Sequence, residues 1–246
     1  PGESDTSLAL SALTEGDATS AMMDVMIRAM SNDRNATDVD DDTMAAQLEA
    51  GMDIGVGGKV PHVLKMSLAA PYIEGMRFVH SLRRAGGWAE VDRAWDRSPT
   101  TTEQILHPEK WRKNEPPISV PPPSGAALGE GWANPFDDTV GEIGLSLAFG
   151  EWIGAADGKR AASDWGGDRL ALFESGEKLA LAMHLRYDAN PKGKGEAFST
   201  RAFQLLAKPA GEKRGETKRA ASTSTWVCFE REALGPFGIL RKENDL

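Results

Sequence analysis

Five prolines fall within eight residues near the middle of the chain, and this cluster constrains the fold more than any other feature of the sequence. Proline lacks an amide hydrogen and has a restricted φ, so neither a helix interior nor a central strand accommodates such a cluster. The prolines are Pro116, Pro117, Pro121, Pro122 and Pro123. They predict an extended, polyproline-like connector. We expect a helical region at 1–115, the connector at 116–136, and a helix with a small sheet at 137–246, packed with the first region as one compact unit.

The residues before the connector have the spacing and the end signals of helices. Pro71 is expected at the first position of its helix, where a missing amide hydrogen costs little. Trp88 and Trp95 lie seven residues apart, on one helix face, and we expect both in the core. Capping residues, glycines and prolines predict helices at 6–30, 42–50, 71–85 and 88–95, and a short one that begins after 100–102 and ends at Pro108.

The residues after the connector alternate between helix and strand signals. A hairpin is expected from strands at 169–174 and 179–187, joined by a turn at 175–178. The other elements expected are helices at 138–153 and 196–208, a polar, basic loop at 211–222, and strands at 224–230 and 237–241. Helices come first and a small antiparallel sheet with a helix follows, so the predicted fold class is α+β.

Composition excludes several classes of protein. The net charge of −9 argues against nucleic-acid binding, and no uncharged stretch reaches the roughly 20 residues that a membrane-spanning helix needs. Cys228 is the only cysteine, so an internal disulfide and a cysteine-based zinc site are both excluded. The four histidines are at least 18 residues apart, and therefore no HExxH motif lies within the chain.

Glu15 is the first candidate functional residue. At 100° per residue it shares one face of the first predicted helix with Leu8, Met22 and Met26, whereas Asp17 points away from that face. A carboxylate inside an apolar stripe must be neutral, paired or bound to a metal, because an unpaired buried charge costs several kcal/mol. Two interpretations stay open: Glu15 lies at the edge of the stripe and reaches solvent or an arginine, or it is a buried functional carboxylate.

An acidic segment offers a possible calcium site. Asp38, Asp40, Asp42 and Glu49 match places 1, 3, 5 and 12 of an EF-hand loop. Thr43 stands where the sharp turn of that loop needs glycine. The same aspartates suit a helix cap, and this second interpretation stays open beside the first.

The run from Pro71 to Trp111 is rich in side chains that are both bulky and polar. Tyr72 lies near its start, and His107 follows Glu103 by four residues near its end. A glutamate and a histidine at that spacing can orient an imidazole, bind a metal, or simply form a structural hydrogen bond.

Four blocks of the chain resemble, in their order and their residues, a family of bacterial secreted or lipid-anchored zinc metallopeptidases. The resemblance covers roughly residues 8–207. Members look like gluzincins, with HExxH on one helix and a glutamate on a following helix. The blocks are LSALTEGDAT, PYIEGMRFVHSLRRAGGWAEVDRAWDRSPTTTEQILHPEKW, DDTVGEIGLSLAF and DWGGDRLALFE.

This resemblance implies a zincin-like helical region and a role for Glu15. The family's L-x-EGDA segment matches Leu13 and 15–18, which implies that Glu15 is the third protein ligand of zinc. The HExxH motif is absent from these 246 residues, so the two histidine ligands and the general base would come from an upstream segment or from a second chain. His107 and Tyr72 are weaker candidates, as contacts to the oxyanion or the substrate. We therefore expect the Glu15 side chain to be mostly buried and to face residues 72–107, and Asp17 to be exposed.

The expected function is that of the C-terminal part of a zinc metallopeptidase-like protein. In intact relatives, zinc-bound water would hydrolyse a peptide bond. The alternative is a non-catalytic binding or scaffold protein that has a peptidase-like fold. The resemblance implies an extracytoplasmic location for either, secreted or lipid-anchored.

Overall fold

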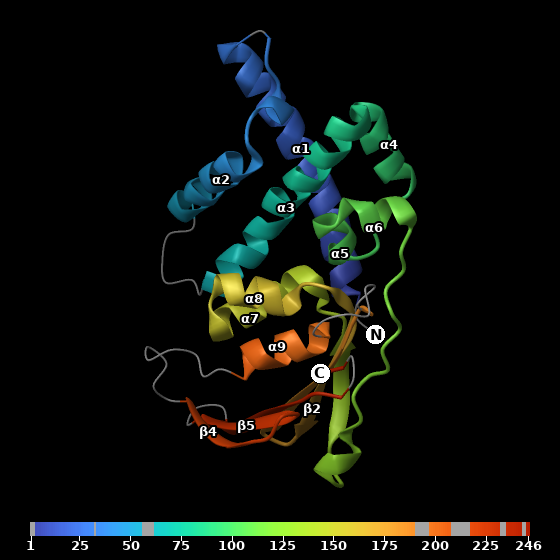
Figure 1. Cartoon of the computed structure of the whole chain (residues 1–246), viewed down its shortest axis with the longest axis vertical. Helices are drawn as coiled ribbons and strands as arrows, with labels where there is room; N and C mark the ends of the chain where they lie inside the picture. The colour runs from blue at the N-terminus through green and yellow to red at the C-terminus, as the bar shows by residue number, and fades with distance from the viewer. Residues whose placement is uncertain are drawn as a thin grey trace. The chain divides into compact units, whose positions relative to one another are not determined.

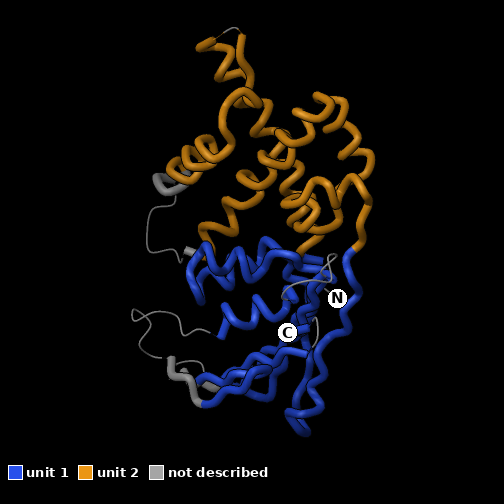
Figure 2. The backbone as a smooth tube through the Cα atoms, viewed as in Figure 1, with its two compact units in different colours: residues 1–4, 117–246 blue, residues 5–116 orange. Residues whose placement is uncertain are grey.

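A computed structural model of the chain describes residues 3–31, 33–55, 62–189, 197–207, 217–231, 235–242 and 245–246. The chain divides into two compact units (Figure 2). Residues 5–116 form the helical unit, and residues 1–4 with 117–246 form the sheet unit. The division falls inside the proline cluster. Helices in the first unit and mixed helices and strands in the second confirm the predicted α+β class.

The helical unit is built around the crossing of α1 and α3, with α2 beside α3 (Figure 1). Met44 and Ala45 of α2 pack against Ala69, Ile73 and Met76 of α3. The elements are α1 (Ser4–Met30), η1 (Ala36–Asp38), α2 (Asp41–Gly55), α3 (His62–Gly86), α4 (Trp88–Asp96), α5 (Thr102–Leu106) and α6 (Pro108–Lys113).

Two glycines let α1 and α3 touch backbone to backbone. A Cβ atom on Gly16 of α1 would lie 2.2 Å from the backbone of Gly75 of α3, and one on Gly75 would lie 1.9 Å from the carbonyl oxygen of Ala12. Neither position has room for a side chain. Small residues at this crossing determine which face of α1 is buried, and the buried set includes Ala9, Ala12, Leu13, Gly16, Thr19 and Ser20.

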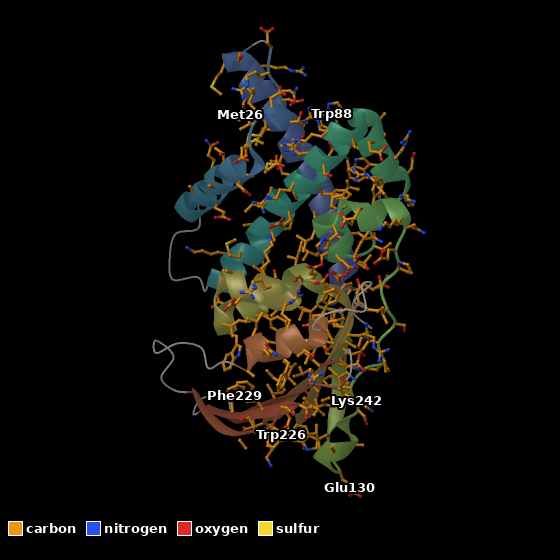
Figure 3. All side chains as sticks on the ribbon, in the orientation of Figure 1. Met26, Trp88, Glu130, Trp226, Phe229 and Lys242 are labelled. Atoms are coloured by element: carbon orange, nitrogen blue, oxygen red, sulfur yellow. The ribbon has the colours of Figure 1, made fainter. Side chains whose placement is uncertain are left out.

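The apolar stripe predicted for α1 overlaps its buried face only at Ala12 and Thr19, and is wrong for the larger side chains. Met22 and Met26 are about half exposed, at 49% and 51%, and Met26 is labelled in Figure 3. Leu8 is only half-buried. The spacing of hydrophobic residues predicted the wrong buried face for α1. The close approach of α3 favours small residues such as glycine, alanine and serine at the contact, and the larger methionines lie outside it.

The helix start predicted at Pro71 is also wrong, because α3 begins at His62 and runs through the proline. A proline inside a helix costs about 3 kcal/mol. Here the turns on both sides of it are held by packing, since Ala69 and Ile73 are both buried in the cluster shared with α2. The burial of those turns offsets the cost of the proline. That burial depends on packing against α2, and no sequence pattern near Pro71 predicts it.

The tryptophans expected in the core are on the surface. Trp88 of α4, which is labelled in Figure 3, is 38% exposed, and Trp95 of the same helix is 42% exposed. Val91 and Ala94 form the buried face of that helix instead. The predicted pair of short helices is confirmed, with α4 ending at Asp96 and α5 beginning at Thr102. Helix α5 ends at Leu106, just before Pro108, as expected. Pro108 then opens α6, a further helix that had no predicted counterpart.

The sheet unit contains two antiparallel three-stranded sheets, in the orders β1-β2-β3 and β4-β5-β6. The predicted hairpin is confirmed as β2 and β3, which pair from Ser175↔Lys178 onward. Gly176 in the turn has φ +59°, a value that favours glycine. The elements are η2 (Gly125–Leu128), β1 (Ala133–Asp138), α7 (Gly141–Ile153), α8 (Ala155–Ala162), β2 (Trp165–Ser175), β3 (Lys178–Tyr187), α9 (Phe198–Leu206), β4 (Thr217–Ser222), β5 (Trp226–Arg231) and β6 (Gly235–Leu240).

Three elements of this unit differ from the sequence prediction. Residues 133–138, at the end of the expected connector, form β1, so the helix predicted from residue 138 begins at Gly141. Helix α8 had no predicted counterpart. Within the expected basic loop at 211–222, residues 217–222 form β4, whereas residues 211–216 lie outside the described residues.

The core of the sheet unit lies between the helices and the two sheets. Trp165 and Tyr187, both fully buried, pack from β2 and β3 against side chains of α7, α8 and α9. On the other sheet, Phe229 of β5 packs against Phe203 of α9, whereas Trp226 lies on the opposite face of β5 and is 38% exposed (Figure 3).

Candidate functional site

Glu15 on α1 contacts Tyr72 on α3, close to the glycine crossing. The Glu15 carboxylate raises the pKa of the Tyr72 hydroxyl, first through its negative charge and further through a hydrogen bond between the two side chains. The expected contact with the segment that follows Pro71 is therefore present. The expected burial is not complete, because Glu15 and Tyr72 are both half-buried.

Asp17 is not the exposed residue that the helix face predicted. It is half-buried, and its carboxylate accepts a hydrogen bond of 2.9 Å from the indole Nε1 of Trp95. Neighbouring carboxylates of α1 thus have different partners, Tyr72 for Glu15 and Trp95 for Asp17. This difference provides a matched pair of variants.

Replacing Glu15 by glutamine is expected to lower the pKa of Tyr72 toward the ordinary tyrosine value. The substitution removes the negative charge that disfavours the tyrosinate ion, so the ion forms at lower pH. Ultraviolet absorbance of tyrosinate measures the titration. The signal is simple, because the only other tyrosine, Tyr187, is 1% exposed and burial strongly raises its pKa.

The control for this titration is Asp17→Asn, which should leave the pKa of Tyr72 where it is in the parent chain. An unchanged Tyr72 titration in Glu15→Gln would show that the two side chains do not interact in solution.

His107 lies at the junction of α5 and α6 and has neighbours of its own. Its backbone amide donates to the carbonyl of Glu103 at 2.8 Å, and its Nδ1 lies 3.9 Å from the Glu109 carboxylate. The buried Glu103 side chain forms an ion pair of 2.6 Å with Lys110. Glu103 and His107, the pair noted in the sequence, are therefore joined by a backbone hydrogen bond that ends α5.

The acidic segment is used for helix caps and ion pairs. Asp38 lies in η1 and completes a capping box with Asn35. Asp40 accepts from the backbone amide of Thr43 at the start of α2. Asp42 lies within α2 and forms an ion pair of 2.6 Å with Arg77, and Glu49 is an exposed residue of the same helix. The structure thus places these four candidate calcium ligands on a 3-10 turn, a cap and two positions of a helix.

A buried histidine and a half-buried aspartate form a pair that the site prediction missed. His80 of α3 is fully buried, and its Nδ1 lies 2.7 Å from the Asp41 carboxylate. Burial lowers the pKa of His80, and its Nε2 has no hydrogen-bond partner among the described residues. Arg84 bonds the same aspartate at 2.6 Å. Asp41 lies within the acidic segment, between Asp40 and Asp42, and no local sequence pattern indicated that His80 is its partner.

The donors around Glu15 are fewer than a catalytic zinc requires, which is three protein ligands and a water. Its carboxylate is of the right kind, and its described neighbour is the Tyr72 hydroxyl. In the part of the chain that the structure describes, no group of three or more histidine, cysteine, aspartate or glutamate side chains could hold a metal ion. Among the described residues, Glu15 is therefore a single candidate ligand without a second or third beside it.

The sheet unit contains an apolar pocket of about 790 Å³ that the sequence did not indicate. Phe149 and Trp152 of α7 and Leu206 of α9 are among its apolar walls. Its polar members include Asp245, whose pKa is lowered by hydrogen bonds from Arg186 at 2.6 and 2.9 Å. The two strands on the pocket are β3, through residues 181–185, and β6, through residues 237–240.

The comparisons with known proteins bear mainly on this unit. Residues 128–246 match a family described as a domain of unknown function (DUF8575). The matched segment lies within the sheet unit and includes every strand described above. No curated protein and no solved structure matches the chain. None of the helices among the described residues is long and apolar enough to cross a membrane.

Proposed function

We propose that the chain is the C-terminal part of a zinc metallopeptidase-like protein, with Glu15 as the third protein ligand of the metal. One observation supports this most directly: a half-exposed carboxylate on α1 is held by a tyrosine hydroxyl from α3. Ligand carboxylates commonly have a hydrogen-bonded partner of this kind, which orients the oxygen that faces the metal. Peptide-bond hydrolysis is the reaction proposed for the intact protein.

Within this proposal, Tyr72 is a positioning residue and the remaining ligands come from an HExxH segment outside these residues. His107 is retained as a candidate contact for the substrate. An extracytoplasmic location, secreted or lipid-anchored, belongs to the same proposal.

We expect residues 1–246 alone to bind zinc weakly or not at all, and to show no peptidase activity. With an HExxH segment present, on the same chain or on a second one, we expect one zinc per protein. Glu15→Ala should then lower the zinc affinity at least about tenfold, the smallest loss usual for groups that support a metal site. Metal analysis after dialysis, and titration against a zinc chelator, measure both.

Asp17→Ala is the control, because Asp17 is bonded to Trp95 and should leave the zinc affinity unchanged. Equal zinc affinity in Glu15→Ala and the parent would remove Glu15 from the metal. One tightly held zinc in residues 1–246 alone would show that the chain completes a site by itself.

The alternative proposal is a non-catalytic binding or scaffold protein. The apolar pocket of the sheet unit favours it, because a cavity of this size with apolar walls and a few polar groups is typical of a binding site. Retained binding through that pocket in a protein without any zinc-dependent peptidase activity would support this alternative.

A further inference from the structure

Residues 36–42 form a strap that includes η1 and the start of α2 and is held on α3 by ion pairs. Arg84 of α3 donates to the Asp41 carboxylate at 2.6 and 2.9 Å and to two backbone carbonyls of the strap. Two turns earlier on the same face of α3, Arg77 pairs with Asp42 at 2.6 Å. Arginine and aspartate side chains are ordinarily charged both at neutral pH and in mild acid, so ion pairs of this kind do not respond to pH in that range.

His80 lies between these arginines on α3 and adds a contact of another kind. Its side chain is fully buried, and its Nδ1 lies 2.7 Å from the Asp41 carboxylate. An ionised carboxylate only accepts hydrogen bonds, so Nδ1 carries the proton, and Nε2 of the neutral ring is unprotonated. Nε2 is buried and has no hydrogen-bond partner among the described residues. A second proton on the ring would therefore go to an atom without an acceptor beside it.

The charges around His80 come from its own helix and from the elements packed against it. Arg83 and Arg84 of α3 repel a positive charge on the imidazole, and Asp41 attracts it. Asp24 of α1 pairs with Arg83 at 2.8 Å, so its charge is already compensated by an arginine. Burial is the largest effect on His80, and together with the arginines it outweighs Asp41, so the pKa of His80 is lowered. The other carboxylates of the strap that act on Arg84 are Asp38 and Asp40.

Mild acid should favour release of the strap from α3. When the strap is released, the imidazole is in water and takes up a proton near its ordinary pKa of about 6.5. When the strap is held, burial lowers the pKa of His80, and the ring stays neutral to lower pH. The contribution of His80 is therefore complete above about pH 6.5 and is lost as the pH falls below that value. Burial acts to raise the pKa of Asp24 and of Asp41, but the hydrogen bonds that they accept outweigh it, so both pKa values are lowered and both groups keep their charge in this range.

We propose that His80 is a pH-sensitive switch, and that its protonation in mild acid releases the strap and the start of α2 from α3. Met44 and Ala45, which follow the strap in α2, pack on α3 residues that include Ile73. Release therefore uncovers an apolar surface of α3 next in sequence to Tyr72. Buried histidines that become charged in mild acid are a general means of opening a packed contact. The inference concerns the helical unit alone and does not depend on a bound metal.

The test is hydrogen exchange of the full chain at about pH 7.5 and about pH 5, with each rate corrected to a protection factor. The amides of Ala36 and Met44 report on the strap, because the first donates to the Asp24 carboxylate and the second to a backbone carbonyl of the strap. Their protection should fall at least about fivefold in acid, and at most about thirtyfold if the held ring stays neutral. The amide of Arg97, bonded at the end of α4, should keep its protection. Unchanged protection at Ala36 and Met44, or an equal fall at Arg97, would overturn the proposal.

Two matched variants assign the response to His80. Asparagine in His80→Asn provides an amide donor for Asp41 but does not titrate, so the fall in protection at Ala36 should disappear. His184 of β3 lies in the sheet unit, 3.5 Å from the Asp245 carboxylate, and His184→Asn should leave that fall as it is in the parent chain. A response that survives His80→Asn, or that His184→Asn also removes, would contradict the assignment.

The protonation state of His80 in the parent chain decides the matter if His80→Asn does not fold. Nitrogen-15 NMR of the imidazole distinguishes a protonated ring nitrogen from an unprotonated one. At about pH 7.5 we expect Nδ1 protonated toward Asp41 and Nε2 unprotonated. A ring that carries a proton on both nitrogens at this pH would show that attraction by Asp41 outweighs burial, and would overturn the switch.

Discussion

Replacing Gly75 by leucine is expected to destabilise the helical unit by about 3 kcal/mol or more. The Cβ atom alone would lie 1.9 Å from the carbonyl oxygen of Ala12, and that oxygen belongs to the backbone of α1. A flexible side chain can turn away from such a clash, but a helix backbone has to move as a whole. Movement of α3 would pull Ile73 and Met76 out of their cluster with α2. Urea unfolding measures the loss as a lower midpoint.

The control for this substitution is another helical glycine. Gly51 of α2 is exposed, and a Cβ atom added there meets nothing within 4 Å. Gly51→Ala should therefore stabilise the protein by about 0.5–1 kcal/mol, because alanine is the better helix former. The two changes should move the urea midpoint in opposite directions. A Gly75→Leu variant that unfolds at the midpoint of the parent would show that α1 and α3 do not touch in solution.

Replacing Asp168 by alanine should destabilise the sheet unit by about 3 kcal/mol or more. Asp168 of β2 is 4% exposed, and it accepts hydrogen bonds of 2.9 Å from the amides of Val140 and Gly141 and from the indole of Trp165. Burial raises the pKa of this carboxyl, and the three donors act against that rise. Alanine would leave all three donors without this acceptor at the start of α7, next to the core.

A surface aspartate of the same unit provides the comparison. Asp157 of α8 forms an ion pair of 3.0 Å with Arg160 at the surface, and Asp157→Ala should change stability by no more than about 0.5 kcal/mol. Thermal or urea unfolding of both variants measures the difference. Equal, small losses would mean that the donors around Asp168 find water when the carboxylate is removed.

The elements that the sequence predicted well are those whose own residues contain the pattern that identifies them. Helix α4 has its own glycine boundary, and the hairpin of β2 and β3 has strand residues on both sides of a glycine turn. Strand β1 lies in a segment with proline and asparagine, and its extended state comes from pairing with β2, for example Phe136 with Leu172. No pattern within β1 itself predicts that it pairs with β2.

The same contrast applies to the candidate sites. The position of Glu15 on its helix left its partner open, and only with the family resemblance was a contact with the segment after Pro71 expected; Tyr72 provides that contact. The degree of burial was not predictable, because it depends on how closely α3 approaches through Gly75. The junction of the two sheets was less predictable still, since it depends on pairing Leu185 with Leu246 across 61 positions of the sequence.

The crossing of α1 and α3 has a mechanical consequence for Glu15. Sliding one helix along the other by a residue would press a side chain into a backbone, whereas a small rotation about the contact keeps Gly16 against Gly75. The contact therefore acts as a pivot that resists translation and permits turning. Points next to a pivot move least when the arms turn, and Glu15 is the residue beside Gly16. In the role proposed for it, Glu15 would have to meet ligands from another segment to within about 0.5 Å, and a position beside the pivot favours that precision.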